Sequence, residues 1–332
     1  MKRILLLFVF LLVLPCQQYA KATFSRPSTW TQKIPAHPEI MANSDQVIQS
    51  IIRSGKFLSG YNPNLPKPGI WSVPVWYATE NDAKQDIQFK ISGNTFRQVI
   101  ADSNWNRNVP IPPEAKPAAY GEDDYYDRHM VVVSHDKRYA WDFYQAILHA
   151  DGRISCNIMN RWDLLRDGIN QPEQFMCCRV APVPLIAGLV FYEEVVQDRA
   201  IHHALAFATS WLDGEQVYPC ISAQGYDGLY GYRLQLDPDV DISSLGLNWA
   251  GEIIAKALQD YGMIYVENNG GGNKIYIESL DDKSESWSGI LDSFNGKIPL
   301  SAFRVVKPVY VDESKDTTPP SPPKNVRAFF YR

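Results

Sequence analysis

The sequence lacks long apolar runs and any excess of basic residues. After residue 22 no stretch is apolar enough over the roughly 20 residues that a transmembrane helix needs. The chain has 32 Lys and Arg against 37 Asp and Glu, and removal of residues 1–22 takes away three cations and no acid, so the formal charge goes from −5 to −8. We therefore expect neither a nucleic-acid partner nor an anionic membrane, because both favour a basic face.

Cysteine is scarce, and its spacing does not suit a zinc site. Cys16 lies in the leader, which leaves Cys156, Cys177, Cys178 and Cys220. No paired C-x-x-C unit is present, which argues against a structural zinc ion. In an exported protein an even number of cysteines predicts disulfides, and four cysteines allow three pairings. A bond between the adjacent Cys177 and Cys178 is the least favoured, because it closes a strained ring.

The glycine-rich stretch at residues 268–273 is not a phosphate-binding loop. It joins two predicted strands instead of opening a helix, and it lacks the Lys-Ser/Thr ending. The sequence also shows no internal repeat at a fixed period.

The first 22 residues have the pattern of a secretory signal peptide. A basic pair precedes an apolar run at residues 4–14 that is too short to span a bilayer, and residues 20–22 form an A-x-A cleavage site. We expect a secreted or periplasmic protein whose residues 23–43 form an N-terminal lead-in. Lipidation of Cys16 is an open alternative, although Pro15 is a poor match to the small residue expected before it.

The rest of the chain has the pattern of a β protein. Its 23 Pro, 20 Gly and 18 Tyr are typical of a loop-rich fold. Short apolar segments separated by turn residues, without β-α-β alternation, predict an all-β, mainly antiparallel sandwich or jelly roll as a single domain over residues 44–315. Two short helices are expected at residues 44–55 and 250–261, where apolar residues have helical spacing. The Pro-rich tail, residues 316–332, predicts a stiff extended linker.

Residues 126–146 predict a hairpin that carries several candidate site residues. Asp127 and His129 stand two residues apart before the first strand, so in an extended chain their side chains share a face. Asp142 and Tyr144 repeat this spacing on the returning strand. An imidazole, a phenol and two carboxylates are therefore expected on one face.

Four further polar residues complete the candidate set. Glu194 lies in a predicted strand at residues 190–196, and His203 has apolar neighbours that suit either a core histidine or a base. Arg233 alternates with apolar residues in a strand, so burial would require an anionic partner. Asn269 opens the glycine-rich turn.

Six segments of the chain match a known pattern of sequence and spacing. They are AHPEIMANSDQVIQSI, VPIPPEAKPAAYGEDDYYDRHMVVVSHDKRYAWDFYQA, IAGLVFYEEVVQDRAIHHALAF, VYPC, YGYRLQL and ALQDYGMIYVENNGG, and the resemblance that they carry runs from about residue 35 to 311. With its D-x-H, GL-x-x-Y-x-E-V and N-N-G motifs the chain resembles a family of secreted, functionally uncharacterised bacterial proteins of actinobacterial and acidobacterial type that are associated with fibronectin type III modules. The tail DTTPPSPPKNV is similar to the linker that opens such a module.

The resemblance implies fold and compartment more than a reaction. Carried over position by position, the family pattern marks Asp127, His129, Asp142, Glu194, His203, Arg233 and Asn269. One departure is that this chain has residues 176–179, MCCR, where the family tends to have Thr-Ser-Ala-Asp. If the aspartate of that segment has a role in the family, this chain either lacks that role or assigns it to another residue.

We expect an exported enzyme that acts on a polysaccharide, and two chemistries fit. A lyase would use His129 or His203 as base and Tyr144 as acid, with Arg233 and Asn269 neutralising a uronate carboxylate. A glycoside hydrolase would use the carboxylates of Asp142 and Glu194, with about 5 Å between them for retention and about 6.5–9.5 Å for inversion.

Two other interpretations remain open. Asp127 could orient His129, bind substrate, or join His129, Glu194 and His203 as ligands of a divalent metal ion. Alternatively, the polar cluster is structural and the protein is a non-catalytic carbohydrate-binding or cell-envelope protein.

Overall fold

The structure is a computed structural model that describes residues 24, 28–60, 70–89, 106–121, 126–166, 177–220, 228–281 and 283–308. The predicted signal peptide and the Pro-rich tail lie outside these residues. Within them, no helix combines the length and the apolar character needed to cross a membrane.

A six-stranded sheet carries the two longer helices. In spatial order its strands are β1 (Leu58–Gly60), β14 (Asn273–Ile275), β11 (Leu205–Thr209), β13 (Met263–Asn268), β12 (Arg233–Leu236) and β16 (Phe303–Val306). Helix α1 (Ser44–Ser54) packs against β16, and α3 (Trp249–Asp260) packs against β12.

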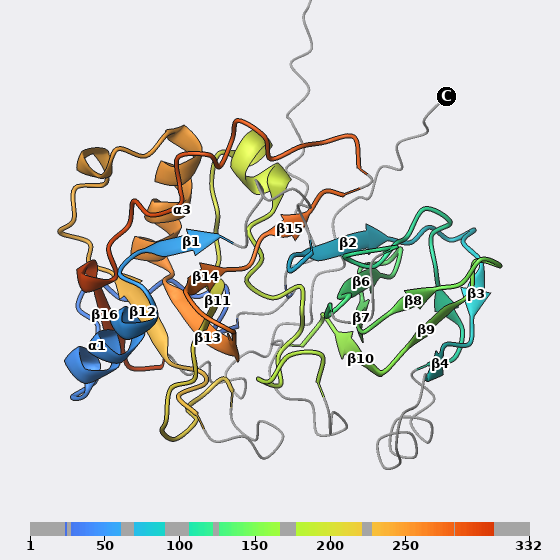
Figure 1. Ribbon diagram of the computed structural model, residues 1–332, viewed down its shortest axis with the longest axis horizontal. Coiled ribbons are helices and arrows are strands. Elements are labelled where there is room, and N and C mark those ends of the chain that lie inside the picture. Colours follow the sequence, from blue (N-terminus) through green and yellow to red (C-terminus); the bar gives the residue numbers. More distant parts are fainter. Residues whose placement is uncertain are drawn as a thin grey trace, which may run out of the picture.

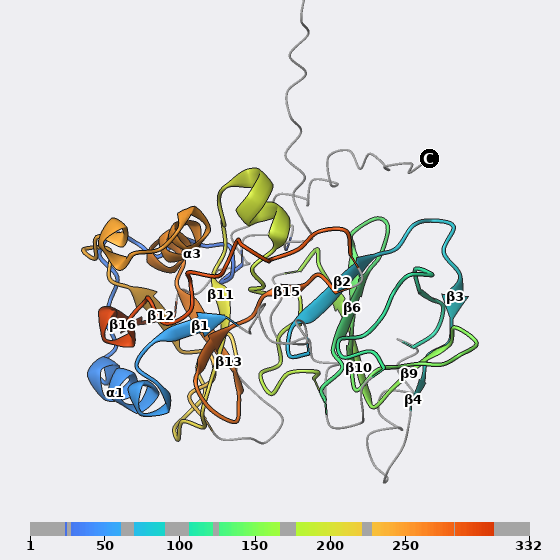
Figure 2. The same ribbon diagram turned by 45° about the horizontal axis from the view of Figure 1, so that its top comes forward.

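A five-stranded sheet forms the centre of the other half of the molecule. Its order is β10 (Ile158–Asp163), β7 (Tyr139–Tyr144), β6 (Met130–Val133), β2 (Val73–Tyr77) and β15 (Glu278–Ser279). Figure 1 shows this sheet on the opposite side of the molecule from α1 and α3, with β15 between the two halves. Figure 2 shows the same separation after rotation. Because β15 follows β14 after a short connection, the chain passes directly from one sheet to the other.

Smaller elements complete the fold. Two small sheets pair β3 (Lys84–Gln85) with β5 (Val109–Pro110), and β4 (Gln88–Phe89) with β9 (Ile154–Cys156) and β8 (Ile147–Leu148). The helical turns are a π-helical turn η1 (Glu194–Asp198) and the 3-10 turns η2 (Ile242–Leu245) and η3 (Leu300–Ala302).

The predicted all-β class with short helices is confirmed. Among the described residues, seven of the twelve strand pairings are antiparallel and five are parallel. Both large sheets are therefore mixed. The parallel pairings join strands that are distant in sequence, such as β2 with β6 and β11 with β13.

The central hairpin strand β6 is buried on both faces. Val131 and Val133 belong to the main core, which the two large sheets share, whereas Met130 and Val132 pack into a second core beneath the small sheets. All four side chains are fully buried, which explains why β6 is a continuous apolar run without alternation. The shared core holds the two halves together.

Strand β2 contains a proline although it is not an edge strand, because β2 lies between β6 and β15. Pro74 pairs with Ser279 of β15, and the pairing with β6 begins only at Val75. Because the prolyl nitrogen faces no strand on the β6 side, the missing N–H interrupts no bond there.

The helix ends follow the sequence closely. Helix α1 ends at Gly55, as predicted, where the Gly55 N–H donates to Ile52 O. Its N-cap is Asn43, and the Ser44 hydroxyl accepts a hydrogen bond from Val305 N (2.9 Å), which ties the helix to β16.

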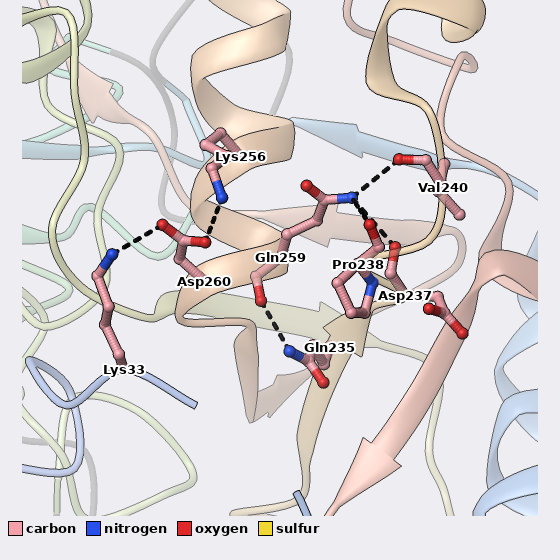
Figure 3. Close-up of polar contacts among 8 residues, drawn as sticks. All are labelled: Lys33, Gln235, Asp237, Pro238, Val240, Lys256, Gln259 and Asp260. Atoms are coloured by element: carbon pink, nitrogen blue, oxygen red, sulfur yellow. Dashed lines mark hydrogen bonds and ion pairs between the residues drawn. The ribbon is translucent and has the colours of Figure 1, made fainter. Parts of the chain in front are cut away.

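Helix α3 is held by polar contacts at its C-terminal end, which Figure 3 shows. Gln259 Nε2 donates toward the carbonyls of Asp237, Pro238 and Val240 at 3.1, 3.3 and 2.9 Å, and Gln259 O accepts from Gln235 Nε2 at 2.8 Å. Outside this group, Asp260 binds Lys33 and Lys256 at the surface. The buried amide fixes the loop after β12, whereas the exposed ion pairs contribute little to stability.

The disulfide prediction is wrong for this structure. Cys156, Cys177, Cys178 and Cys220 are all free and buried. Each thiol packs in an apolar core, and those of Cys178 and Cys220 approach the carbonyls of Ile158 and Tyr265 at 3.7 and 3.9 Å. Burial raises the pKa of Cys156 and of Cys220, so both remain protonated thiols.

Candidate functional site

A cleft of about 800 Å³ opens where the two large sheets meet. One wall comes from the β6–β7 hairpin and its neighbours, and the other from the ends of β13 and β14 and the turn between them. Its lining residues are Trp71, Asp127, His129, Tyr144, Ile158, Cys177, Cys178, Arg179, Val180, Glu267, Asn268, Asn269, Gly270, Gly271, Lys274 and Tyr276.

The hairpin presents three of the predicted site residues to this cleft. Its register pairs Val131 with Asp142, so His129 and Tyr144 come next to each other at its open end, with ring centroids 5.6 Å apart. Asp127 also lines the cleft. The chain between Asp127 and His129 is not extended as expected, because Arg128 has φ 44°. A non-glycine residue in this left-handed region costs about 1–3 kcal/mol, and such strain concentrates at functional sites.

His129 is a neutral imidazole with a defined tautomer. Burial is the main cause that lowers its pKa, the Arg179 charge lowers it further, and the Asp127 charge opposes both. Its Nε2 lies 3.1 Å from Cys178 O. Because a carbonyl only accepts, Nε2 carries the hydrogen and Nδ1 carries the lone pair.

Glu267, at the end of β13, was not predicted as a site residue. Its pKa is raised to about 8, mainly by burial and also by the negative charge of Asp127, against the hydrogen bonds from Val180 N (2.8 Å) and Asn268 N (3.0 Å) and the charge of Arg179, which lower it. Glu267 is therefore a protonated acid at neutral pH. The signal in the sequence was an acid that interrupts the apolar run of β13 directly before the glycine-rich turn.

Asp127 differs from the other acids of the cleft region in having no bonded partner. Its side chain is half-buried, and among the described residues its carboxylate makes no hydrogen bond or ion pair. A carboxylate in this position is available to a ligand.

The turn after β13 supplies Asn269, which was predicted as a site residue, and β14 supplies a cation that was not predicted. Asn269 Oδ1 accepts from Gly271 N (2.9 Å), while its Nδ2 has no partner within the described chain. Lys274 of β14 also lines the cleft. Across the cleft, Trp71 makes an edge contact with Tyr126, with ring centroids 5.4 Å apart.

Arg179 forms the floor of the cleft at the position where the resembled family tends to have aspartate. Its guanidinium donates to the carbonyls of Pro184, Leu185 and Ala187 at 3.1, 2.9 and 3.0 Å, and it lies over the Tyr276 ring at 4.6 Å. It is 1 % exposed, so it acts on the cleft through its charge and not as a free donor.

Asp142 lies beneath the cleft and does not line it. Its Oδ2 accepts from Trp162 Nε1 (2.8 Å) and from Leu185 N (2.7 Å), and burial raises its pKa to about 7. Asp142 ties the hairpin to the segment that carries Arg179.

Glu194 and His203 form a closed pair elsewhere in the core. The predicted strand at 190–196 is instead the π-helical turn η1, which brings Glu194 Oε2 to 3.1 Å from His203 Nε2. His203 Nδ1 lies 2.9 Å from Ala204 O. Burial alone would lower the pKa of His203, but the charge and hydrogen bond of Glu194 outweigh it, so the pKa is raised.

Arg233 is a third, separate element. It is 1 % exposed and donates to the carbonyls of Tyr261 (2.7 Å) and Gln32 (2.8 Å). Burial lowers its pKa to about 10. The expected anionic partner is not found among the described residues, because main-chain carbonyls take its place.

The predicted polar set therefore divides. Asp127, His129, Tyr144 and Asn269 meet in the cleft, while Asp142, Glu194, His203 and Arg233 are structural neighbours of other elements. Asp142 and Glu194 do not face each other as a hydrolase pair. The described residues contain no group of three His, Cys, Asp or Glu side chains placed to hold a metal ion, so the metal site imagined from Asp127, His129, Glu194 and His203 does not form.

Comparison of the chain with protein-family models, with curated proteins and with solved structures gives no match. The resemblance that the sequence motifs carry therefore stays a prediction.

Proposed function

We propose that the cleft is an acid–base site that hydrolyses a glycosidic bond of a polysaccharide, with Glu267 as the general acid and Asp127 as the second carboxylate. One observation carries this proposal. Two acids line the same cleft, one has a pKa raised to about 8, and the other has no bonded partner. Acids whose environments differ in this way are typical of glycoside hydrolases.

The roles follow from the protonation states. Protonated Glu267 donates its proton to the glycosidic oxygen as the bond to the anomeric carbon breaks. Asp127 either activates a water molecule for attack on that carbon or attacks it directly, with inversion or retention respectively. The neutral Nδ1 of His129 accepts a hydrogen bond from a sugar hydroxyl or from the attacking water.

A β-elimination is the second candidate, and the His129–Tyr144 contact favours it. The unprotonated Nδ1 would take the proton next to a uronate carboxylate, and the Tyr144 hydroxyl would protonate the leaving oxygen. Lys274 and protonated Glu267 would then neutralise the carboxylate. Arg233, expected for this role from the sequence, lies elsewhere in the fold.

The products distinguish the two reactions. Mature protein is incubated with a panel of neutral and acidic polysaccharides. Hydrolysis gives new reducing ends without near-ultraviolet absorbance, whereas elimination gives an unsaturated product that absorbs there. If neither product forms with any polymer, the cleft is a binding site, and the non-catalytic alternative replaces both.

Secretion or periplasmic export is part of this proposal. It rests on residues 1–22, which lie outside the described structure. An extracytoplasmic location suits a polymeric substrate that does not enter cells. Mass measurement of the mature protein tests it, with cleavage after Ala22 as the expected result.

A further inference from the structure

One exposed tryptophan, Trp211, follows a strand that ends beside residues of the cleft, and its ring is held by two contacts. Trp211 is 45 % exposed. Its indole Nε1 donates to Asp213 Oδ1 at 2.7 Å, and its ring meets Tyr230 edge to face, with centroids 6.4 Å apart at 87°. Tyr230 is itself buried and stacks on Tyr265 at 4.8 Å. An exposed ring fixed by these contacts loses little freedom when it binds a ligand.

Trp211 is linked to residues of the cleft through its neighbours Thr209 and Tyr230. It follows β11, whose last residue Thr209 pairs with Asn268 at the end of β13, so both strands finish at the same edge. Thr209 O accepts from Asn269 N (2.9 Å), and Asn268 Nδ2 donates to the Tyr230 hydroxyl (3.2 Å). Asn268 and Asn269 line the cleft.

The second exposed tryptophan of the described chain offers a contrast. Trp249, at the start of α3, is 39 % exposed, but the Arg199 guanidinium lies over its ring at 3.8 Å. A stacked cation already occupies one face of that ring. No cation–π contact is found on Trp211 among the described residues.

We infer that Trp211 is a sugar-stacking subsite that extends the cleft and binds neutral polysaccharide chains. The C–H face of a pyranose ring is apolar and weakly positive, which suits the negative face of an indole. Asp213, which binds the indole, and Glu215 are both exposed in the loop that follows Trp211, so the loop carries negative charge and disfavours a uronate. The inference rests on the proposed function and narrows its substrate to neutral glycans, which favours hydrolysis over elimination.

Affinity electrophoresis tests this subsite without requiring turnover. Mature protein carrying Asp127→Asn, so that polymers are not cut, is run in gels containing hydroxyethylcellulose, laminarin, galactomannan or xylan. Carboxymethylcellulose serves as the acidic counterpart with the same backbone as hydroxyethylcellulose. We expect retardation by at least one neutral polymer and weaker retardation by carboxymethylcellulose than by hydroxyethylcellulose.

The matched variants are made in the same background. Trp211→Ala should raise the Kd for the retarding polymer about tenfold, as for loss of an aromatic anchor. Trp249→Ala should change it by less than about twofold, as for an ordinary surface substitution. Trp211→Phe keeps a flat ring and should recover most of the affinity, which separates lost stacking from lost folding.

A charge change adds a test that does not depend on Trp211 tolerating substitution. Glu215→Lys alters an exposed side chain and should increase retardation by carboxymethylcellulose. The inference is overturned if no neutral polymer retards the protein, if Trp249→Ala weakens binding as much as Trp211→Ala, or if Glu215→Lys has no effect on the acidic polymer. Binding that depends on Trp211 without turnover by wild-type protein would contradict the proposed hydrolysis alone, and turnover without such binding would contradict this subsite alone.

Discussion

The cleft and the Glu194–His203 pair contain the same kinds of group and use them in opposite ways. Each contains a carboxyl group and a histidine that is almost fully buried, with His129 4 % and His203 3 % exposed. Burial acts on both imidazoles in the same direction. Nevertheless the pKa of His129 is lowered and that of His203 is raised.

The difference comes from what each ring nitrogen faces. Both nitrogens of His203 face acceptors, a carboxylate and a carbonyl, so the ring is fully satisfied only as an imidazolium. His129 has one carbonyl partner, and the Arg179 charge lies nearby. Burial alone therefore does not set the protonation state of a histidine. The number of hydrogen-bond acceptors around the ring decides whether it is a charged imidazolium or a neutral imidazole with a free lone pair.

The acids repeat this contrast. Burial raises the pKa of Asp142 to about 7 and that of Glu267 to about 8. Asp142 is closed in by Trp162 and Leu185, whereas Glu267 opens onto the cleft. A raised pKa marks a candidate for chemistry only when a ligand can reach the group.

The largest expected effect is on turnover. Asp127→Asn should lower kcat about 10²–10⁴-fold, the range for loss of an acid–base group, because the amide neither activates water nor attacks carbon. Its melting temperature should stay within a few degrees, since the carboxylate has no bonded partner among the described residues. Reducing-end assays and thermal denaturation measure the two quantities.

Asp142→Asn is the matched control for this prediction. It makes the same chemical change on an acid outside the cleft, so kcat should change far less. Equal losses of activity in the two variants would mean that an acid in the cleft is no more important for catalysis than an acid outside it.

The next largest effect is on stability. Glu194→Leu leaves a buried imidazolium without its carboxylate and should cost about 3–5 kcal/mol of unfolding free energy. The folded pKa of His203 is raised above 6.5, so the stabilisation is fully present below pH 6.5 and is lost as the pH rises through the folded pKa. Urea denaturation at several pH values should show the greatest loss at pH 6.5 and below. A loss that is constant with pH, or under about 1 kcal/mol, would show that the pair holds no charge.

A smaller effect concerns the pH dependence of stability. Between pH 3.8 and about 7 the folded protein keeps a proton on Asp142 that the unfolded chain has released. This group therefore lowers stability as the pH rises, by up to about 1.4 kcal/mol per pH unit. Asp142→Asn should flatten the stability curve in this window. An unchanged slope would place the titration on another group.

The smallest effect is a limb in the pH–rate profile. As the general acid, Glu267 must be protonated, so kcat/KM for the free enzyme should fall about tenfold per pH unit above about pH 8. Replacing Asp127 removes a negative charge that raises this pKa, so in Asp127→Asn the limb of any residual activity should shift to lower pH. A limb near pH 4.5 would argue against the assignment of Glu267.

Local patterns in the sequence predicted a large part of the fold. The all-β class, both helices and the central hairpin follow from spacing over a few residues, as at Val47, Ile48 and Ile51 on the buried face of α1. The hairpin alone placed His129 beside Tyr144. These features depend on contacts between near neighbours in the chain.

The site was only half predictable because its second wall comes from distant sequence. Glu267 and Lys274 line the cleft because β13 and β14 pack against the half of the molecule that contains the β6–β7 hairpin. The local pattern of apolar and polar residues does not predict this long-range packing. The π-helical turn at Glu194 has the same apolar composition as a strand, so the pattern of apolar residues wrongly predicted a strand there. The disulfide prediction failed because an even number of cysteines and an exported location do not determine whether two thiols lie close enough to bond.

The protonation states of the two histidines test the central contrast most directly. Imidazole ¹⁵N spectra of the mature protein at pH 6.5, assigned with His129→Gln and His203→Gln, report both charge and tautomer. We expect His129 to be mostly neutral with its hydrogen on Nε2, and His203 to be mostly protonated on both nitrogens. A protonated His129, or a neutral His203, would contradict the division into a reactive cleft and a structural pair.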